Sequence, residues 1–169
     1  MTELADSHYR PVLVVEDSAD DFDTVVEALR RARIRNRLVH AVNADAARHV
    51  LAASSHGPFA FVLLDCSLPG EDGLSFLQDL RRAPATSMLP VVVFTASLNP
   101  RDLNAFYAAG ANAYHVKRVQ FEECLSTVQD IFRYWLMQVV LPDAPAPLSS
   151  PSTSSSLSLS LSISPRQLS

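Results

Sequence analysis

The sequence has little cysteine and no long apolar run. Its two cysteines, Cys66 and Cys124, are far apart and match no metal-binding spacing, so we expect reduced thiols and a cytoplasmic protein. No apolar run approaches the roughly 18 residues that a membrane span needs. The first ten residues have no apolar core. We therefore expect neither a secretory signal nor a membrane partner.

The sequence also lacks an excess of basic charge. Its 169 residues carry a net charge of -4 at pH 7, the pI is near 5.7, and 48% of the residues are apolar. This balance is typical of a globular protein and gives no general reason to expect a nucleic-acid partner. One run, residues 30–37, contains five arginines. We interpret it as the solvated end of a helix, with partner docking or nucleic-acid binding as alternatives.

Short apolar runs alternate with helical patterns five times along the chain. The predicted strands cover residues 11–15, 37–42, 59–64, 90–95 and 112–116. The predicted helices cover residues 20–32, 44–54, 73–82, 100–110 and 121–140. Strands that are apolar on both faces are typical of a parallel sheet with helices on both sides. The sequence therefore predicts an α/β fold, a doubly wound parallel sheet.

Four of the five predicted strands end in residues that can bind ions or donate hydrogen bonds. These residues are Glu16, Asp17, Asp65, Thr95 and Lys117. Ligands of open parallel sheets bind beyond the carboxyl ends of the strands, so we expect these side chains to share one cleft. Taken singly, each has an ordinary interpretation as a helix cap, a turn hydroxyl or a surface charge.

The chemistry of this group indicates a metal and a phosphoryl group. Three clustered carboxylates repel one another, so the predicted site needs a cation. Carboxylate oxygens and water suit Mg²⁺. A lysine and a hydroxyl then remain to hold an anion beside the metal. This combination indicates phosphoryl transfer to a carboxylate, with Asp65 as the nucleophile.

Four segments together resemble the receiver domain of two-component response regulators. They are VVEDS (14–18), VLLDCSLPGEDG (62–73), VVVFTAS (91–97) and AYHVK (113–117), within a resemblance that covers about residues 10–140. The resemblance implies a flavodoxin-like fold, with helices on both faces of a five-stranded parallel sheet in the order 2-1-3-4-5. It also implies a signalling protein that catalyses only its own phosphorylation and dephosphorylation.

The resemblance further implies roles at the acidic end of the sheet. Asp65 would accept the phosphoryl group from a sensor histidine kinase. Asp17 would bind Mg²⁺ directly and Glu16 through water, with Asp65 and the backbone carbonyl of Ser67 as further ligands.

The same resemblance implies a conformational switch. Thr95 would hydrogen-bond the phosphoryl group and Lys117 would pair with it. Tyr114 occupies the position of the family's switch aromatic. The predicted fourth helix, fifth strand and fifth helix would form the output face.

Shorter motifs are similar to the small single-domain regulators that serve phytochrome-type histidine kinases. These motifs are EDSADD (16–21), ASLNPRD (96–102) and FRYWLMQVVLP (132–142). The chain departs from the family at Lys117-Arg118, where the family usually has Lys-Pro and that proline often supports a cis bond. A non-proline cis bond costs about 2.5–4 kcal/mol, so we predict a trans bond here.

Two other functions compete with the signalling switch. One is a phosphatase or phosphotransferase that forms an aspartyl phosphate. Haloacid-dehalogenase-like enzymes would need a second acid two residues after Asp65, where this chain has Ser67. The other is a phosphorylation-independent scaffold of the same fold, and the complete acid, Thr95 and Lys117 set counts against it.

The composition divides the chain into three parts. We predict an N-terminal arm at residues 1–9, a receiver domain at 10–141 and a Ser/Pro-rich tail at 142–169. The tail lacks the apolar mass to fold alone, and we expect it to be disordered. The alternative is that LSLSLSI (157–163), which alternates like a strand, adds to the edge of a sheet.

The last predicted helix has more apolar surface than its own sheet needs. At about 1.5 Å per residue, residues 121–140 span about 30 Å. We expect one face to cover the sheet with Phe121, Leu125, Val128, Phe132 and Val139. The residues beside or opposite that face are Ile131, Tyr134, Trp135 and Met137, and we predict that they form a homodimer interface next to the switch surface. The alternative is that Trp135 and its neighbours fold back on the body.

Overall fold

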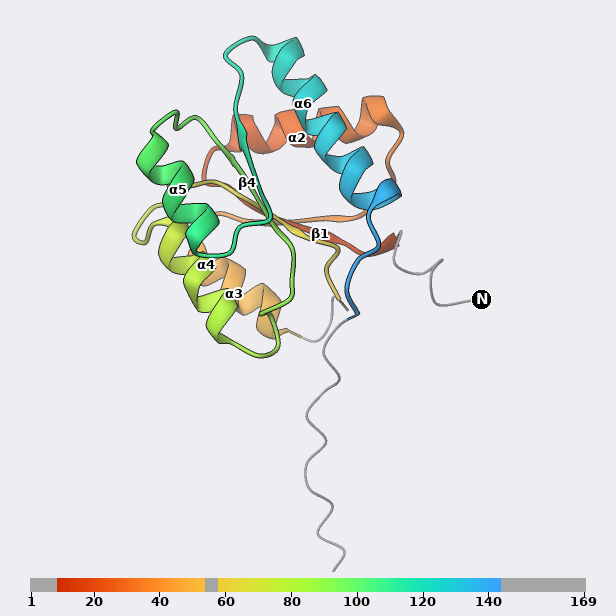
Figure 1. The fold of residues 1–169 in the computed structure, drawn as a ribbon. Coiled ribbons are helices and arrows are strands. Elements are labelled where there is room, and N and C mark those ends of the chain that lie inside the picture. The colour runs from red at the N-terminus through yellow and green to blue at the C-terminus, as the bar shows by residue number, and fades with distance from the viewer. Residues whose placement is uncertain (1–8, 54–57, 144–169) are drawn as a thin grey trace, which may run out of the picture.

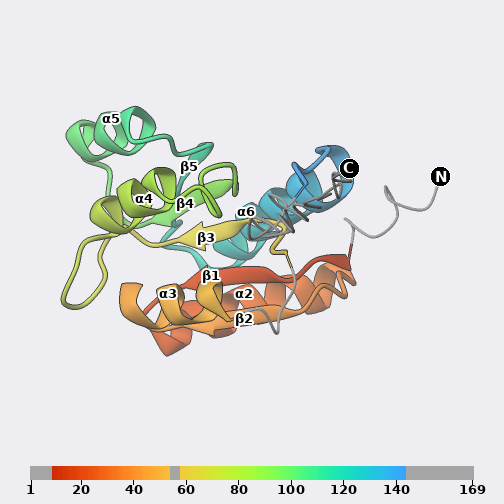
Figure 2. The ribbon, with the colours of Figure 1, turned by 90° about the horizontal axis from the view of Figure 1, so that it is seen from below.

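A five-stranded parallel sheet forms the centre of the molecule. The computed structural model describes residues 9–53 and 58–143, so the predicted tail from 144 and almost all of the arm lie outside the described residues. The strands of the sheet (Figure 1) are β1 (Val12–Val15), β2 (Leu38–Ala41), β3 (Val62–Leu64), β4 (Val91–Thr95) and β5 (Ala113–Val116). Their order is β2-β1-β3-β4-β5, as the labels in Figure 2 show. This order confirms the predicted sheet.

Helices cover both faces of the sheet, as predicted. They are α2 (Ala19–Ala32), α3 (Ala44–Ala52), α4 (Gly73–Arg82), α5 (Pro100–Ala108) and α6 (Phe121–Arg133). Figures 1 and 2 show α2 and α6 on one face and α3, α4 and α5 on the other. Within the described ranges, no helix combines the length and apolarity needed to cross a membrane.

Polar residues fix where three of the helices begin. Ser18 accepts a hydrogen bond from the Asp21 backbone N–H, and Asn43 accepts one from that of Ala46. Asn99 caps α5, whose first turn begins with Pro100. Each cap satisfies a backbone donor that has no partner inside its helix. These three helices begin within five residues of the end of the preceding strand, so the turns that connect them are short.

Side chains that alternate along the strands build two separate cores. Val12 and Val14 of β1 pack with α2 and α6, whereas Leu13 and Val15 pack with the helices of the other face. All four of these side chains are at most 1% exposed. The strands are therefore anchored on both sides, and their carboxyl ends are held rigidly.

The last helix differs from its prediction in geometry. The α-helical part ends at Arg133, and a π-helical segment, Tyr134–Gln138, follows it before the chain becomes extended at Val139. Arg10 then holds the end of this segment, because its guanidinium donates a 2.7 Å hydrogen bond to the Pro142 carbonyl. The helix therefore does not run straight past its sheet but turns back to the start of β1.

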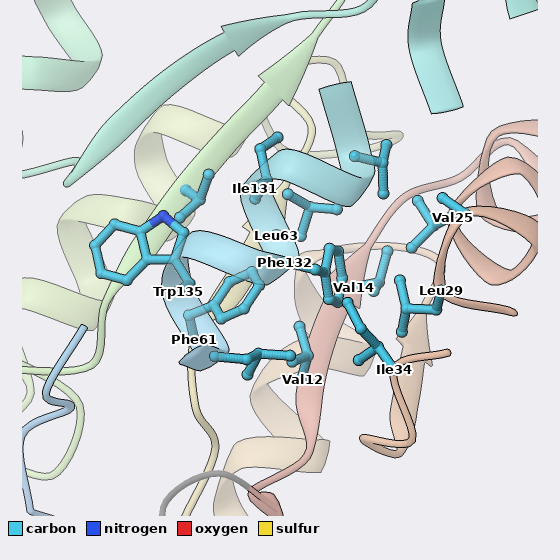
Figure 3. Close-up of a cluster of buried hydrophobic side chains, with 14 of the residues drawn as sticks. Val12, Val14, Val25, Leu29, Ile34, Phe61, Leu63, Ile131, Phe132 and Trp135 are labelled. Atoms are coloured by element: carbon cyan, nitrogen blue, oxygen red, sulfur yellow. The ribbon is translucent and has the colours of Figure 1, made fainter. Parts of the chain in front are cut away.

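Two of the four predicted interface residues are buried inside the chain. Ile131 is 2% and Trp135 9% exposed, and the Trp135 ring centroid lies 6.1 Å from that of Phe61 (Figure 3). Their assignment to the exposed side was wrong. Trp135 lies three residues after Phe132 and seven after Val128, a spacing that puts all three on the sheet-facing side.

The other two interface candidates are exposed, as predicted. Tyr134 is 53% and Met137 58% exposed. Phe121, in contrast, was expected to cover the sheet and is 51% exposed. It lies in the first turn of α6, where the Arg31 guanidinium is 6.0 Å from its ring centroid. The exposed apolar surface of α6 is therefore smaller than the sequence suggests, and it is divided between the two ends of the segment.

Replacing Trp135 with alanine should destabilise the monomer. The indole fills the core against Phe61, so the Trp135→Ala variant should lose about 3–5 kcal/mol of unfolding free energy. The exposed Met88 provides a control outside this segment, since Met88→Ala should cost less than about 1 kcal/mol. Urea unfolding followed by circular dichroism measures both values. A Trp135→Ala loss that appears only at high protein concentration would place the indole in an interface instead.

Candidate functional site

Backbone hydrogen bonds carry the sheet one residue past its strands and fix the site residues there. The Glu16 N–H donates to the Ala41 carbonyl at 3.0 Å, and the Asp65 N–H donates to that of Val15 at 3.0 Å. The Lys117 N–H donates to the Thr95 carbonyl at 2.7 Å. The residues predicted from the strand ends therefore gather at one edge of the sheet.

The ammonium group of Lys117 connects three carboxylates at this edge of the sheet. Its Nζ donates to Glu16 Oε2 at 2.6 Å, to Asp21 Oδ2 at 2.6 Å and to Asp65 Oδ2 at 3.1 Å. The Lys117 and Asp65 side chains are only 11% and 10% exposed. No cis peptide bond occurs in the described residues, so Lys117–Arg118 is trans, as predicted.

Burial and hydrogen bonding act on the charges of this group in opposite directions. Burial raises the pKa of Glu16, and the hydrogen bond and charge of Lys117 only partly oppose this. Burial by itself would lower the pKa of Lys117, but its bonds to Asp21 and Glu16 raise that pKa above its usual value. The ammonium therefore stays protonated at neutral pH and holds the acids together.

Three acids of this edge have the arrangement that a metal ion requires. Oxygens of Glu16, Asp17 and Asp65 all lie within 4.8 Å of one another. Glu16 and Asp65 are buried, whereas Asp17 is exposed and leaves one side of the group open to water. With Asp21, four carboxylates face one ammonium, so negative charge remains in excess. This donor set fits Mg²⁺, which prefers carboxylate oxygens and retains several waters.

The turn after β3 is packed so tightly against Asp65 that it requires glycine. A Cβ at Gly73 would overlap the Asp65 carbonyl oxygen and come within 3.2 Å of Cys66 Cα. The Gly73 N–H donates to the Cys66 carbonyl at 2.9 Å, which closes the turn. The Ser67 N–H lies 3.4 Å from Asp65 Oδ1. Ser67 therefore lies next to the acid, and its carbonyl as a metal ligand stays a prediction.

Thr95 and Tyr114 lie on neighbouring strands beside this group. The Thr95 side chain is 1% exposed, and its Oγ1 accepts a 3.3 Å hydrogen bond from the Ser97 N–H. Tyr114 is partly buried, and its hydroxyl donates to the Ser97 carbonyl at 3.2 Å. Burial raises the pKa of the Tyr114 phenol to about 12. One short turn therefore connects the predicted phosphoryl-contacting hydroxyl to the predicted switch aromatic.

Asp21 is the site residue that the sequence analysis missed. It lies in the first turn of α2, where an acid is expected merely to complement the helix dipole. Its distance from Lys117 in the sequence gave no sign of the contact. The signal that could have found it is the helix cap at Ser18, because the residue three positions after a cap lies in the first turn, close to the strand end that precedes the helix.

Comparisons with known proteins agree with this geometry. Residues 12–129 match the family described as the response regulator receiver domain. The response regulator Rcp1 of Synechocystis is 33% identical over 139 residues, which span 79% of this chain and 93% of Rcp1. The crystal structure of Mn²⁺-bound Rcp1 superimposes with a TM-score of 0.73 over 79% of this chain and 99% of Rcp1.

Two further solved structures are similar over the same region. The phosphorylated cyanobacterial phytochrome response regulator RcpA is 26% identical, with a TM-score of 0.75 over 80% of this chain and 99% of RcpA. The bacteriophytochrome response regulator AtBRR is 33% identical, with a TM-score of 0.60 over 79% of this chain and 98% of AtBRR. The chain therefore belongs to the response regulator receiver family.

Proposed function

We propose that this response regulator accepts a phosphoryl group on Asp65 from a sensor histidine kinase of the phytochrome type, in the cytoplasm. The observation that supports this most directly is the placement of Asp65. Its carboxylate ends a buried strand, lies 3.1 Å from the Lys117 ammonium, and shares a metal-type cluster with Glu16 and Asp17. The similarity to RcpA, a phytochrome response regulator, and to AtBRR, a bacteriophytochrome response regulator, supports the phytochrome connection. The free thiols of Cys66 and Cys124 agree with a reducing compartment.

The chemistry uses the residues at this edge in distinct ways. An Asp65 oxygen attacks the phosphorus of the phosphohistidine, the new P–O bond forms, and the P–N bond to the histidine breaks. Glu16, Asp17, Asp65 and the Ser67 carbonyl would hold Mg²⁺, which when bound neutralises charge on the phosphoryl oxygens. The Lys117 ammonium pairs with a phosphoryl oxygen, and the Thr95 hydroxyl donates to another.

The alternative enzymatic function has less support. A haloacid-dehalogenase-like phosphatase needs a second acid two residues after the nucleophile, and that position is Ser67, which is exposed. In the present proposal the protein catalyses only its own phosphorylation and dephosphorylation. A scaffold that ignores phosphate would have no use for a cluster of carboxylates that outnumbers its one ammonium group.

Asp65 should become phosphorylated in a reaction that needs a divalent ion. Incubation with acetyl phosphate and Mg²⁺ should add one phosphoryl group, because the acid cluster supplies both the nucleophile and the metal ligands. Intact-protein mass spectrometry measures the mass gain, and EDTA should abolish it. The matched control is Asp72→Asn, which removes a carboxylate from the same loop and should still be labelled. Undiminished labelling of Asp65→Asn would rule out the assignment.

We further propose that Thr95 and Tyr114 convert phosphorylation into a change of surface. The new charge on Asp65 should draw the Thr95 hydroxyl away from the Ser97 N–H, to which it is bonded at 3.3 Å. The turn from Thr95 to Ser97 then shifts, and the Tyr114 ring follows its Ser97 carbonyl partner. The face formed by α5, β5 and α6 changes as a result.

The Thr95→Ala variant should separate phosphorylation from this change. It keeps the nucleophile and the metal ligands, so it should still accept phosphate. It lacks the hydroxyl, so the phosphorylation-dependent NMR shifts on α5, β5 and α6 should largely disappear. Thr86→Ala, which removes a hydroxyl from the loop before β4, serves as the control and should shift as the wild type does. Wild-type shifts in phosphorylated Thr95→Ala would contradict the mechanism.

We also propose that the protein forms a homodimer through the edge formed by β5 and α6. In the described sheet β5 pairs with β4 alone and leaves its other edge open. A groove of about 610 Å³ lies beside this edge, with Ala113, His115 and Tyr134 among its lining residues. Tyr134 provides exposed apolar surface in this groove, whereas Met137, three residues further along, lines a separate hollow with Ile34. A two-fold arrangement would pair equal surfaces.

Charged substitutions on the exposed positions test the dimer. Ile131 and Trp135 are buried, so changes there would measure stability instead. The Tyr134→Asp, Met137→Asp double variant should elute as a monomer in size-exclusion chromatography with light scattering, whereas the wild type should be a dimer. Met88→Asp is a matched control, because Met88 is 56% and Met137 58% exposed. A wild-type monomer, both with and without phosphodonor, would exclude the dimer.

A further inference from the structure

We propose that Asp21 is a positioning residue of the phosphoryl site. Asp21 and Glu16 both hold the Lys117 ammonium at 2.6 Å, and Asp21 thereby keeps it off Asp65, which lies at 3.1 Å and stays available to a divalent cation. This inference rests on the proposed function, because it concerns the same site. It gives a role to a residue that is not among those proposed to bind the metal or the phosphoryl group. The expected consequence is a cation affinity that depends on a carboxylate which does not bind the cation.

The distances show how the three donors of the ammonium are divided. Lys117 Nζ lies 2.6 Å from Asp21 Oδ2 and 3.1 Å from Asp65 Oδ2. The hydrogen bond from Lys117 to Asp21 is therefore shorter than the one from Lys117 to Asp65, the proposed phosphoryl acceptor. Since an ammonium has three N–H groups and three acceptors surround it, any donor that Asp21 holds is unavailable to the two buried acids.

A closed ring of hydrogen bonds keeps Asp21 in this place. The Ser18 N–H donates to Glu16 Oε1 at 3.1 Å, and the Asp21 N–H donates to Ser18 Oγ at 3.2 Å. Lys117 completes the ring, because it donates to both Asp21 and Glu16. The helix cap of α2 and the lysine of β5 are therefore parts of one structure, and the Asp21 carboxylate is aimed at the ammonium by its own backbone.

Asp21 is close to the metal cluster without being one of its members. The cluster that the described residues form contains Glu16, Asp17 and Asp65 and not Asp21. The Asp21 side chain is 43% exposed, so it keeps contact with water on its outer side. Asp21 thus shares the lysine ammonium with Glu16 and Asp65 without belonging to the group of oxygens that could hold the ion.

Two effects of removing this charge have the same sign. Without the Asp21 carboxylate, the ammonium turns its third donor toward Asp65, now 3.1 Å away, and competes with the cation for that carboxylate. The site also loses one negative charge that attracts the cation. Both effects weaken cation binding. An acid that only complemented the helix dipole would produce neither, and Asp20 in the same turn offers that comparison.

Magnesium titrations of the unphosphorylated full chain by isothermal calorimetry test the proposal. Asp21→Asn should raise the Kd for Mg²⁺ roughly tenfold, since it alters both the charge and the lysine position. Asp20→Asn makes the same charge change on the same turn, and should raise the Kd about twofold or less because water screens it. Asp21→Glu keeps the carboxylate and should stay within about threefold of the wild type. Equal weakening by Asp20→Asn and Asp21→Asn would overturn the proposal.

A second background isolates the lysine. In Lys117→Met protein the effect of Asp21→Asn should fall to that of Asp20→Asn, and an undiminished effect would overturn the proposal. Circular dichroism without metal establishes that each variant is folded, and Asp21→Ala replaces Asp21→Asn if that variant is not. If the wild type binds Mg²⁺ and accepts phosphate, but Asp21→Asn has the same Kd for Mg²⁺ as the wild type, this inference alone is refuted. A wild type that accepts no phosphate refutes the proposed function instead.

Discussion

The functional edge of the sheet depends on one buried ammonium group. Lys117 bonds to carboxylates that come from the ends of β1 and β3 and from the start of α2. Without it, Glu16 and Asp65 would be two buried acids without a compensating charge, an arrangement that costs several kcal/mol. With Lys117 present, the two acids are compensated, but the carboxylates around it still outnumber the one ammonium. The same interaction therefore preserves the fold at this edge and leaves the edge ready for a metal cation.

The strand order explains why this residue is a lysine and why its neighbour is small. β1 and β3 are adjacent, so Glu16 and Asp65 are close, but β4 separates β3 from β5. Only a long side chain can reach across the end of β4 to the acids. The Lys117 ammonium lies 5.8 Å from the Phe94 ring centroid, and the compact Thr95 leaves the path open. The positions of Asp65, Lys117 and Thr95 thus follow from the order of the strands.

The sequence predicted what depends on short patterns and missed what depends on three-dimensional reach. Strand ends, helix caps and the residues at the carboxyl edge were predictable, because apolar runs and parallel topology determine them. The pairing of Asp21 with Lys117 was not, since it spans 96 positions and depends on a side-chain rotamer. The burial of Trp135 was predictable from its spacing to Phe132 but was misassigned. The π-helical segment after Arg133 leaves no signal in the apolar pattern.

The packing also limits which parts of the structure can move in response to phosphorylation of Asp65. In the π-helical segment after α6, Trp135 packs against Phe61 and Phe132 in the core, so this part of the chain has little freedom to move. The turn from Thr95 to Ser97 is held by two hydrogen bonds that meet at Ser97, one from its N–H and one to its carbonyl. If the hydrogen bond from the Ser97 N–H to Thr95 is lost, Ser97 can move, and the hydrogen bond from the Tyr114 hydroxyl to the Ser97 carbonyl is weakened as well. In the proposed switch, movement of this turn and of the Tyr114 ring is therefore the step that alters the face of α5, β5 and α6, while the sheet remains fixed.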